Sequence, residues 1–340
     1  MKRLLVLLCI CGMLFSFVGC ADTVKRFQYT YLDVFDTVTV LQLYATSQQV
    51  ADDWAAQLHA RLSALHNEFS IYDTIQGLQN VKAVNDAVGE AVTVSTDLMR
   101  MLQYGKQAYT LTDGKVNMAM GSVLCLWHQA RNAEKPLPPS NAALSAANQH
   151  TDITNVVLDT AAGTVQLTDT AMSLDVGAFA KGLAAQWVAQ YAVDLGVHSA
   201  LISVGGNVVA VGDKQGKPFI IGIENPKNPQ EHLLTVDVQN CAVVTSGDYQ
   251  RYFEVDGVRY HHLIDPDSLQ PAQYFASVSV IGPDSGMADI LSTALFLMPQ
   301  QEGAALLKTV EGYEAVWVEH TGDLVYSDGF TAFLHQGDTV

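Results

Sequence analysis

The sequence predicts an α+β fold, with helices and a mixed antiparallel sheet in a single domain over residues 27–335. Strand-like and helical segments follow one another in mixed order with hairpin signals, which favours α+β over a doubly wound parallel sheet. The chain is 49% hydrophobic and 16% charged, the balance of a globular protein with a large core. No internal repeat or linker-like stretch divides it, so one interleaved domain is expected.

Local patterns place the elements of the first half. Runs of β-branched and aromatic residues predict strands, whereas apolar residues recurring every three or four positions predict helices. Serine before such a helical pattern is a typical N-cap, because its hydroxyl accepts a free backbone N–H. In order, the expected elements are strand character over 27–43 with a turn at 33–36, a helix capped by Ser47, a helix from Ser95 or Thr96 to Gly114, a short helix capped by Ser140 after the proline loop 136–139, strands at 156–159 and 165–168, and a long helix that follows 175–182 and ends near Gly196.

The second half is expected to be richer in strands. Asp256-Gly257 between two β-type runs is a strong signal for a two-residue hairpin. The apolar run from Gly286 to Phe296 has no glycine or proline after its first residue, which predicts a buried helix. In order, the expected elements are strands at 200–204, 219–223, 233–238 and 242–245, a hairpin of 252–255 with 258–262, the helix 286–296, a helix through 304–307, and a hairpin around 321–323.

The N-terminus has the pattern of a bacterial secretory signal. Lys2 and Arg3 precede an apolar run over 4–18, too short for a comfortable membrane span. Gly19-Cys20-Ala21 then resembles a lipoprotein cleavage motif, although Phe17 stands where leucine is usual. We therefore expect a signal peptide over 1–19, a lipidated Cys20, and a lipid-anchored protein on the extracytoplasmic face of the cell membrane. The alternative is a soluble secreted protein cleaved nearby.

Charge and cysteine content narrow the classes of ligand. The net charge of −17 argues against nucleic acid, which needs basic patches. It does not argue against an anionic ligand, because a metal can supply local positive charge. Of five cysteines, Cys125 and Cys241 remain beyond the signal and Cys20, and their apolar surroundings predict buried thiols rather than a disulfide or metal site.

Asp289 and Thr293 are the polar residues that stand out in the predicted helix 286–296. They are four positions apart and therefore share one helix face. A carboxylate and a hydroxyl inside an apolar helix are costly without partners, and a hard cation such as Mg²⁺ binds both kinds of oxygen. The simpler interpretation is that Asp289 caps the helix and Thr293 bonds to a carbonyl. Considered alone, the helix favours the simpler interpretation.

Two other stretches contain residues suited to chemistry. Segment 174–182 places Asp175 before small residues and Lys181 at a helix start, where backbone N–H groups favour an anion; a capped helix with a surface lysine is the alternative. Segments 245–249 and 261–266 bring a histidine, His262, next to an aspartate at a strand end, which suits a general base. A structural histidine is the alternative, and it is favoured for a lone histidine.

Several familiar signatures are absent from the mature sequence. It contains no Gly-x-x-x-x-Gly-Lys-Ser/Thr, Gly-x-Gly-x-x-Gly, His-Glu-x-x-His, Gly-x-Ser-x-Gly or Cys-x-x-Cys pattern. Common nucleotide hydrolases, zinc proteases and serine hydrolases are therefore disfavoured.

Together these stretches resemble one family, the ApbE family of flavin transferases (FAD:protein FMN transferases). The resemblance begins at Tyr31 and reaches about Phe330, nearly the whole mature chain. Each matching piece is short, but all stand in family order. They are Phe35-Asp36-Thr37, Phe69-Ser70-Ile71-Tyr72, Val116-Asn117 through Leu126-Trp127, Leu174 to Gly182, Val204-Gly205-Gly206-Asn207, Thr245-Ser246-Gly247-Asp248-Tyr249, His262-Leu263-Ile264-Asp265-Pro266, and Ala288-Asp289 through Ser292-Thr293-Ala294.

The resemblance implies a T-fold-related catalytic domain and a metal-dependent flavoprotein enzyme outside the cytoplasm. The family splits the FAD pyrophosphate, places FMN on a Thr or Ser hydroxyl of an acceptor protein, and releases AMP. By position, it implies a Mg²⁺ site formed by Asp289, Thr293 and the Ala178 backbone carbonyl, with His262 as the base. The implied FAD-contacting positions are Phe35, Tyr72, Lys115, Val116, Asn117, Asp175, Lys181 and Leu263.

Two segments depart from the family pattern. Asn117 to Ser122 stands where many members have Asp-Ile-Thr-x-Gly-Pro, so a negative charge is missing there. Ser268-Leu269 replaces a usual Thr-Gly, so the loop after Pro266 is expected to turn differently. The metal and base positions are intact.

Two alternatives to flavin transfer remain at this point. One is an FAD pyrophosphatase that uses the same residues on water and gives FMN and AMP. The other is a non-catalytic flavin-binding lipoprotein. The chain has no good Ser/Thr-Gly-Ala-Thr/Ser acceptor motif of its own, so the acceptor is expected to be a separate protein, often one of membrane-associated electron transfer in this family.

Overall fold

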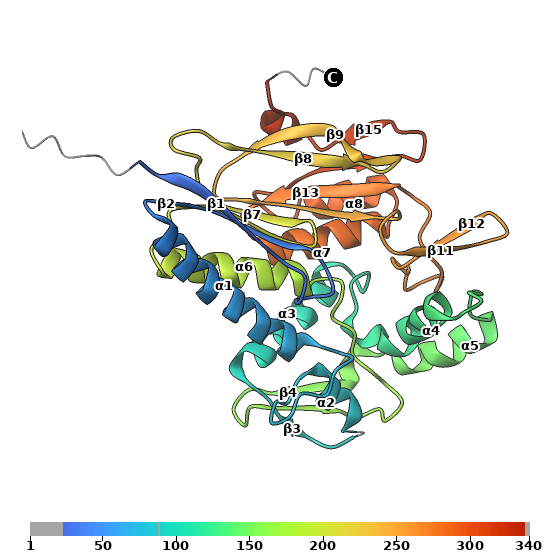
Figure 1. Ribbon diagram of the computed structural model, residues 1–340. Helices are drawn as coiled ribbons and strands as arrows, with labels where there is room; N and C mark the ends of the chain where they lie inside the picture. Colours follow the sequence, from blue (N-terminus) through green and yellow to red (C-terminus); the bar gives the residue numbers. More distant parts are fainter. Residues whose placement is uncertain (1–22, 88, 337–340) are drawn as a thin grey trace, which may run out of the picture.

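The computed structural model describes residues 23–87 and 89–336 (Figure 1). The expected signal peptide over 1–19 and the expected lipidation at Cys20 lie outside the described residues and stay predictions. Within the described ranges, no helix has both the length and the apolar character that crossing a membrane requires.

An eight-stranded sheet forms the centre of the described part of the chain. Its strand order is β1-β2-β6-β7-β10-β13-β14-β15. Every neighbouring pair in it is antiparallel. The strands are β1 (Lys25–Tyr31), β2 (Thr39–Ala45), β6 (Ser199–Val204), β7 (Asn207–Gly212), β10 (Ala242–Gly247), β13 (Ser277–Gly282), β14 (Glu314–Val318) and β15 (Leu324–Tyr326).

Helices cover one face of this sheet. They are α1 (Gln48–Phe69), α6 (Ala180–Asp194), α7 (Ser285–Phe296) and α8 (Gln300–Leu307). In Figure 1, α1 and α6 lie side by side under the sheet, and their apolar residues join one large core with those of the strands. Every residue of α7 except Met287 is buried, so this helix has neighbours on all sides. A polar side chain on α7 must therefore find its partners inside the protein.

A long hairpin covers the opposite face of the sheet. Its strands are β8 (Phe219–Asn225) and β9 (Asn228–Val238), which pair with each other and not with the central sheet. Figure 1 shows the hairpin lying across the sheet on the side away from α1 and α6. A second core cluster forms between them, with Phe219, Val236 and Phe330 among its members. Phe330 comes from the short η4 (Phe330–Phe333) near the end of the chain.

The remaining elements form two smaller layers beneath the helices. One contains α2 (Val81–Asp86), α3 (Thr96–Leu111) and a three-stranded sheet of β3 (Val92–Thr93), β5 (Thr164–Leu167) and β4 (Val156–Asp159). The other packs α4 (Gly121–Asn132) and α5 (Asn141–Ala147) near the hairpin of β11 (Tyr252–Val255) and β12 (Val258–His261). Short 3₁₀ turns, η1 (Met118–Met120), η2 (Asn148–His150) and η3 (Ile153–Asn155), connect these parts.

The predicted helix caps at Ser47 and Ser140 are confirmed, and Ser95, predicted only as a possible helix start, is a third cap. The hydroxyl of Ser47 accepts from the Val50 N–H at 3.3 Å. The hydroxyl of Ser95 accepts from Leu98 at 3.0 Å, and that of Ser140 accepts from Ala143 at 3.2 Å. Each cap satisfies a backbone donor in the first helical turn that has no partner within the helix.

The predicted turn at 33–36 is confirmed: it lies in the 32–38 segment, which leaves the sheet and joins the antiparallel strands β1 and β2. The prediction for one cysteine is wrong. Cys125 is exposed on α4 rather than buried, and Cys241 is half-buried. Both are free thiols, as expected. Helices α2 and α4 and strand β13 were not anticipated from the sequence. The α+β class with antiparallel sheets is confirmed.

Candidate active site

A cavity of about 660 Å³ opens between the central sheet and the smaller layers. Segments far apart in sequence contribute its walls: the 35–40 loop and strand start, the end of α1, α4, the 175–181 segment, the turn between β6 and β7, the end of β10, and α7. Every residue predicted for catalysis, flavin contact or metal binding lines this cavity. These are His262; Phe35, Tyr72, Lys115, Val116, Asn117, Asp175, Lys181 and Leu263; and Ala178, Asp289 and Thr293.

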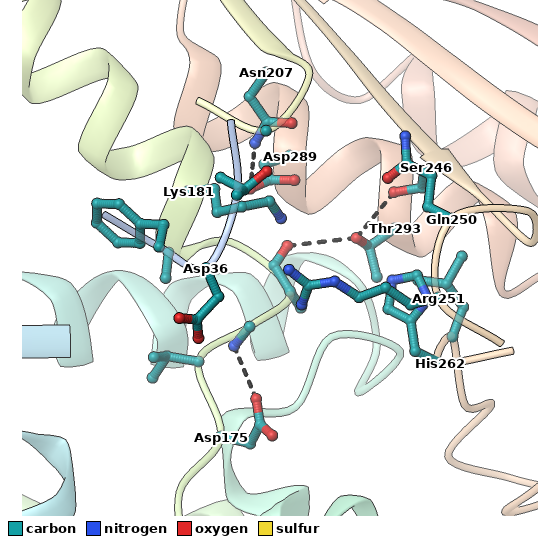
Figure 2. A pocket seen from close by; sticks show the side chains of 18 of the residues that line it. Asp36, Asp175, Lys181, Asn207, Ser246, Gln250, Arg251, His262, Asp289 and Thr293 are labelled. Atoms are coloured by element: carbon teal, nitrogen blue, oxygen red, sulfur yellow. Dashed lines mark hydrogen bonds between the residues drawn. The ribbon is translucent and has the colours of Figure 1, made fainter. Parts of the chain in front are cut away.

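Asp289 does not cap α7. The N-cap is Asp284, whose carboxylate accepts from the Met287 N–H at 2.8 Å. Asp289 lies one turn later and is only 4% exposed. Its Oδ2 accepts two hydrogen bonds, from the Gly182 N–H at 2.8 Å and from the Asn207 side-chain amide at 2.9 Å (Figure 2). The simpler interpretation of Asp289 as a helix cap is therefore wrong.

Burial changes the pKa of the Asp289 carboxyl group. Desolvation raises its pKa, while Lys181 and the hydrogen bonds from Gly182 and Asn207 oppose that rise. The Lys181 ammonium forms no ion pair within the described residues, and its side chain lies beside Asp289 in Figure 2. The other carboxylate oxygen, Oδ1, accepts no hydrogen bond from any described residue. A buried anion with a free oxygen on a cavity wall is a site for a cation.

Thr293 and Ala178 line the same cavity as this carboxylate. The Thr293 hydroxyl, one turn further along α7, is 3.4 Å from the Ala178 carbonyl and 3.3 Å from the Ser246 hydroxyl (Figure 2). Thr293 therefore bonds to a carbonyl of another segment, and the bond back to its own helix is made by Ser292 to the Asp289 carbonyl at 3.1 Å. The hydroxyl and carbonyl that were predicted to bind metal are in contact.

This donor set fits a hard divalent cation. It offers a carboxylate, a hydroxyl and a carbonyl, the oxygen types that Mg²⁺ binds. Only one of the three groups is charged. This suits Mg²⁺, because the ion usually completes its coordination with water molecules and with phosphate oxygens of a bound substrate. Among the described residues, no group of three or more His, Cys, Asp or Glu side chains is placed to hold a metal ion.

The site depends on a close approach between α6 and α7. A Cβ atom at Gly182 would lie 2.4 Å from the Ser285 carbonyl oxygen and 2.5 Å from the Asp289 Cβ. Only glycine therefore lets the start of α6 donate its backbone N–H to Asp289. A glycine pair, Gly205 and Gly206, serves the other donor: both have positive φ, 59° and 90°, and form the tight turn that precedes Asn207.

The two adjacent histidines have different roles. His261, at the end of β12, is buried; its Nε2 bonds to the Ala272 carbonyl at 2.7 Å and its Nδ1 accepts from the Leu263 N–H at 3.2 Å. His262 lines the cavity, and its buried Nδ1 has no hydrogen-bond partner in the described structure. Burial, helped by the positive charges of Lys181 and Arg251, lowers the pKa of His262 to about 3. The ring is therefore neutral near pH 7 and able to accept a proton.

The acid near His262 in sequence does not pair with it. The Asp265 carboxylate instead contacts the Lys115 ammonium at 2.8 Å, and Asp267 contacts the same ammonium at 2.8 Å. Lys115 thus lies on the cavity wall with its charge already balanced by two carboxylates. This arrangement anchors the loop after His262 to the segment before α4.

Asp175 and the 35–36 loop shape the far side of the cavity. Asp175 is buried, and its Oδ1 accepts from the Gly177 N–H at 2.8 Å, which folds the 175–181 segment toward the cavity (Figure 2). Phe35 and Asp36 have positive φ angles of 56° and 50°, an uncommon conformation for residues other than glycine. The Phe35 N–H donates to His66 at 3.0 Å, which helps to hold this strained loop. Strain of this kind is typical of functional sites.

Sequence reasoning missed several cavity residues. Arg131 and Arg251 both line the cavity, and neither forms an ion pair within the described residues. Arg251 comes two residues after the quoted 245–249 motif, but nothing in the sequence showed that its side chain would extend into the cavity as Figure 2 shows. On α4, Leu124, His128 and Arg131 are spaced by four and three residues, so one helix face meets the cavity. This spacing was readable once the segment was known to be helical.

Comparison with known proteins identifies the family. The sequence model of the ApbE family matches residues 35–317. The chain belongs to the ApbE family. The FAD:protein FMN transferase of Treponema pallidum (strain Nichols) is 32% identical over 335 residues, which cover 93% of this chain and 90% of that protein. The FAD:protein FMN transferase of Klebsiella pneumoniae (strain 342) is 35% identical over 250 residues, which cover 73% of this chain and 77% of that protein.

Solved ApbE structures share the fold. The crystal structure of the ApbE protein from Thermotoga maritima has a TM-score of 0.83 and 29% identity, covering 92% of this chain and 100% of that chain. The flavinyl transferase ApbE from Pseudomonas stutzeri, in its apo form, has a TM-score of 0.78 and 27% identity, covering 93% of this chain and 98% of that chain. The predicted ApbE membership, fold class and transferase class are confirmed.

Proposed function

We propose that this ApbE-family protein is an FAD:protein FMN transferase that moves the FMN moiety of FAD to a Thr or Ser hydroxyl of an extracytoplasmic acceptor protein and releases AMP. One observation supports this most. A single cavity contains a buried carboxylate with a free oxygen, a hydroxyl in contact with a carbonyl, and a neutral histidine, contributed by Asp289, Thr293, Ala178 and His262.

Three cationic side chains of the cavity suit a pyrophosphate. Lys181, Arg131 and Arg251 bring three positive charges to its walls without ion pairs to described residues, in a chain whose net charge is −17. Burial and the neighbouring Arg251 lower the pKa of Arg131, so these guanidinium groups repel each other in the free protein. An anionic ligand between them would relieve that repulsion.

Mg²⁺ held by Asp289, Thr293 and the Ala178 carbonyl would supply charge neutralisation for the phosphate oxygens and the departing AMP. The Gly182 N–H and the Asn207 amide hold one Asp289 oxygen and so aim the other at this position. The Ser246 hydroxyl restrains the Thr293 hydroxyl in the same way.

His262 is placed to activate the acceptor. An alcohol is a weak nucleophile until a base removes its proton, and a neutral imidazole on the cavity wall can do so. In the proposed step, the proton moves from the acceptor hydroxyl to His262 and the hydroxyl oxygen bonds to the FMN phosphorus. The bond from that phosphorus to the bridging oxygen breaks, and AMP leaves with that oxygen. A bound anion raises the proton affinity of His262, because it offsets the nearby positive charges.

The cavity walls also offer surface for the rings of FAD. Tyr72 is 56% exposed at the cavity, a large aromatic residue left without a packing partner on one side. Phe35, Val116 and Leu263 add apolar surface to the same cavity. Its volume lies in the range of cavities that bind cofactor-sized ligands.

The decisive experiment measures transfer directly. The protein lacking residues 1–19 would be incubated with FAD, Mg²⁺ and candidate acceptor domains, and the acceptor would be analysed for covalent flavin by in-gel fluorescence and intact mass. We expect a labelled acceptor, one AMP released per label, and no label in EDTA.

The same assay separates the alternatives. The acceptor domains would include ones that a related transferase labels. If this protein labels none of them but releases free FMN and AMP, its activity is FAD hydrolysis and not transfer. FAD binding without turnover would indicate a flavin-binding lipoprotein.

A further inference from the structure

Three side chains, those of Tyr72, His128 and Asp175, lie in a row along the cavity wall. The Tyr72 hydroxyl lies 3.2 Å from Nδ1 of His128, and the two ring centroids are 6.1 Å apart at an angle of 48°. The other ring nitrogen of His128, Nε2, faces Asp175, 3.9 Å from its Oδ2. All three residues line the cavity. None of the predicted roles involves His128.

The hydrogen bond between Tyr72 and His128 has a preferred donor and acceptor. A carboxylate near Nε2 favours the imidazole tautomer with its proton on Nε2. In that tautomer Nδ1 carries a lone pair, and the Tyr72 hydroxyl is the group that can donate to it. The orientation of the hydroxyl therefore depends on Asp175, although Asp175 does not touch Tyr72.

The other groups around His128 keep it neutral. Burial lowers its pKa, and the positive charges of Arg131 and Arg251 lower it further, while Asp175 opposes them. A neutral ring is required for Nδ1 to accept a hydrogen bond. The same guanidinium groups and Asp175 also face Tyr72, whose pKa is raised by burial and by Asp175, so its hydroxyl keeps its proton.

The position of Tyr72 explains why such a restraint would matter. Its side chain follows the end of α1 in an irregular segment, where the backbone alone does not fix a ring. At 56% exposure, little packing holds it. The bond to His128 connects the hydroxyl end of the ring to α4, a rigid helix, so one face of the ring can be kept toward the cavity.

We propose that His128 is a positioning residue that fixes the Tyr72 ring as a stacking surface for a flat ring of the dinucleotide, and that Asp175 acts on this ring through His128. This inference rests on the proposed function only in taking FAD as the ligand. It assigns to Asp175 an indirect effect in addition to the FAD contact that the family resemblance implies.

The test uses binding, not turnover, and the protein lacking residues 1–19. FAD would be titrated in EDTA by calorimetry, and the circular dichroism of the flavin band would report on ring geometry. FMN and AMP, titrated separately, show which half of FAD lies on Tyr72. The variants are His128→Leu, His128→Asn, Tyr72→Phe and the double variant of Tyr72→Phe with His128→Leu. Gln129→Leu, on the exposed side of α4 and outside the cavity, is the matched control.

We expect His128→Leu and Tyr72→Phe each to weaken FAD binding by about fivefold, the equilibrium effect of losing one hydrogen bond. The double variant should be no weaker than either single one, because both remove the same bond. His128→Asn keeps an acceptor near the position of Nδ1 and should restore binding to within about twofold and restore the flavin dichroism. Gln129→Leu should bind as the wild type does.

Three results would overturn the inference. His128→Leu could bind FAD as tightly as wild type, His128→Asn could be as weak as His128→Leu, or the two single effects could add in the double variant. Loss of folding is monitored by thermal unfolding; if His128→Leu unfolds early, Tyr72→Phe and His128→Asn still decide the question. A wild type that binds FAD normally but transfers nothing would contradict the proposed function and leave this inference standing.

A separate set of variants tests the role of Asp175. Asp175→Asn can donate an amide proton to Nε2 and so favour the other tautomer, in which Nδ1 donates to the Tyr72 oxygen and the hydroxyl proton points away from His128. We expect this variant to weaken binding more in the wild-type background than in His128→Leu. Equal losses in both backgrounds would assign Asp175 a direct FAD contact only.

Discussion

At the scale of single residues, the two oxygens of Asp289 have separate tasks. Oδ2 accepts the Gly182 N–H and the Asn207 amide, which ties α7 to α6 and to the turn before β7. Oδ1 is left for a ligand. The buried charge is costly by itself, as its raised pKa shows, and the protein offsets that cost with Lys181 and two hydrogen bonds.

Replacing Asp289 should separate chemistry from folding. We expect Asp289→Ala to lower FMN transfer by at least about a hundredfold, because the cation loses its charged ligand. Residual activity would be measured with saturating FAD and Mg²⁺. His262→Ala is the comparison: it should slow transfer while largely sparing FAD binding.

The control for Asp289 is another carboxylate on the same helix. Asp284→Asn keeps an oxygen for the Met287 N–H and lies outside the cavity, so it should transfer FMN at close to the wild-type rate. Wild-type rates in both Asp289→Ala and His262→Ala would show that the site has been assigned wrongly.

His261 predicts how stability depends on pH. Burial lowers its pKa from 6.5 to about 4. Between these values the unfolded chain takes up a proton that the folded protein does not, so stability present above pH 6.5 is lost as the pH falls toward 4. The shift corresponds to at most about 3 kcal/mol. His261→Gln should flatten the fall in melting temperature over this range, whereas the exposed control His198→Gln should not.

At the scale of elements, local signals were readable and distant contacts were not. The caps at Ser47 and Ser140 are interactions within one turn, so sequence alone predicted them, as it predicted the helix start at Ser95 or Thr96. Strand β13 was missed although its Ser-Val-Ser-Val sequence alternates and Gly282-Pro283 follows it; it is buried along its whole length because strands and a helix pack around it, so its two faces do not differ in exposure.

The candidate site shows the same division. The predicted site residues all lie on one cavity, because the family resemblance carried information about positions that spacing alone could not give. The pairing of Lys115 with Asp265 joins residues 150 positions apart and was not readable. Arg131 was missed because α4 itself was not recognised as a helix.

The contact between α6 and α7 makes a prediction at this scale. Gly182→Ala places a methyl group against backbone and the Asp289 side chain, so the helices must separate. We expect a loss of about 1–3 kcal/mol in the free energy of unfolding, measured with urea, and a larger proportional loss of transfer, because Asp289 moves.

Gly303→Ala is the matched control. It lies in α8, where a Cβ would meet the flexible Leu295 side chain at 3.1 Å, so its stability should change by less than about 1 kcal/mol. Equal effects of the two substitutions would show that the α6–α7 approach has no special requirement for glycine.

At the scale of the whole molecule, charge is distributed unevenly. The chain carries a net charge of −17, yet three cations without ion pairs to described residues gather in its main cavity. Four carboxylates, of Asp36, Asp175, Glu224 and Asp289, line the same cavity, so its cationic side chains bring it close to neutral and make it less repulsive to an anionic dinucleotide than a uniformly acidic surface would be.

The proposed lipid anchor is tested on the full-length chain. Cys20→Ser should move the protein from the membrane fraction to the soluble fraction of cells, because no acyl chain can be attached, while the transfer activity of the purified domain stays unchanged. Cys11→Ser, within the apolar run of the signal, should leave the protein in the membrane fraction. Membrane retention of Cys20→Ser would place the anchor elsewhere or replace it with an uncleaved signal.

The position of β1 at the edge of the sheet has a consequence for reach. Only five peptide units separate Cys20 from Lys25, where β1 begins, so an acylated Cys20 would tether the start of β1 within ~18 Å of the lipid attachment point. The loop that follows β1 reaches the cavity at Phe35, one strand length, ~20 Å, from that starting point. Such a short tether would restrict the acceptors of the enzyme to proteins that present their hydroxyl close to the bilayer surface.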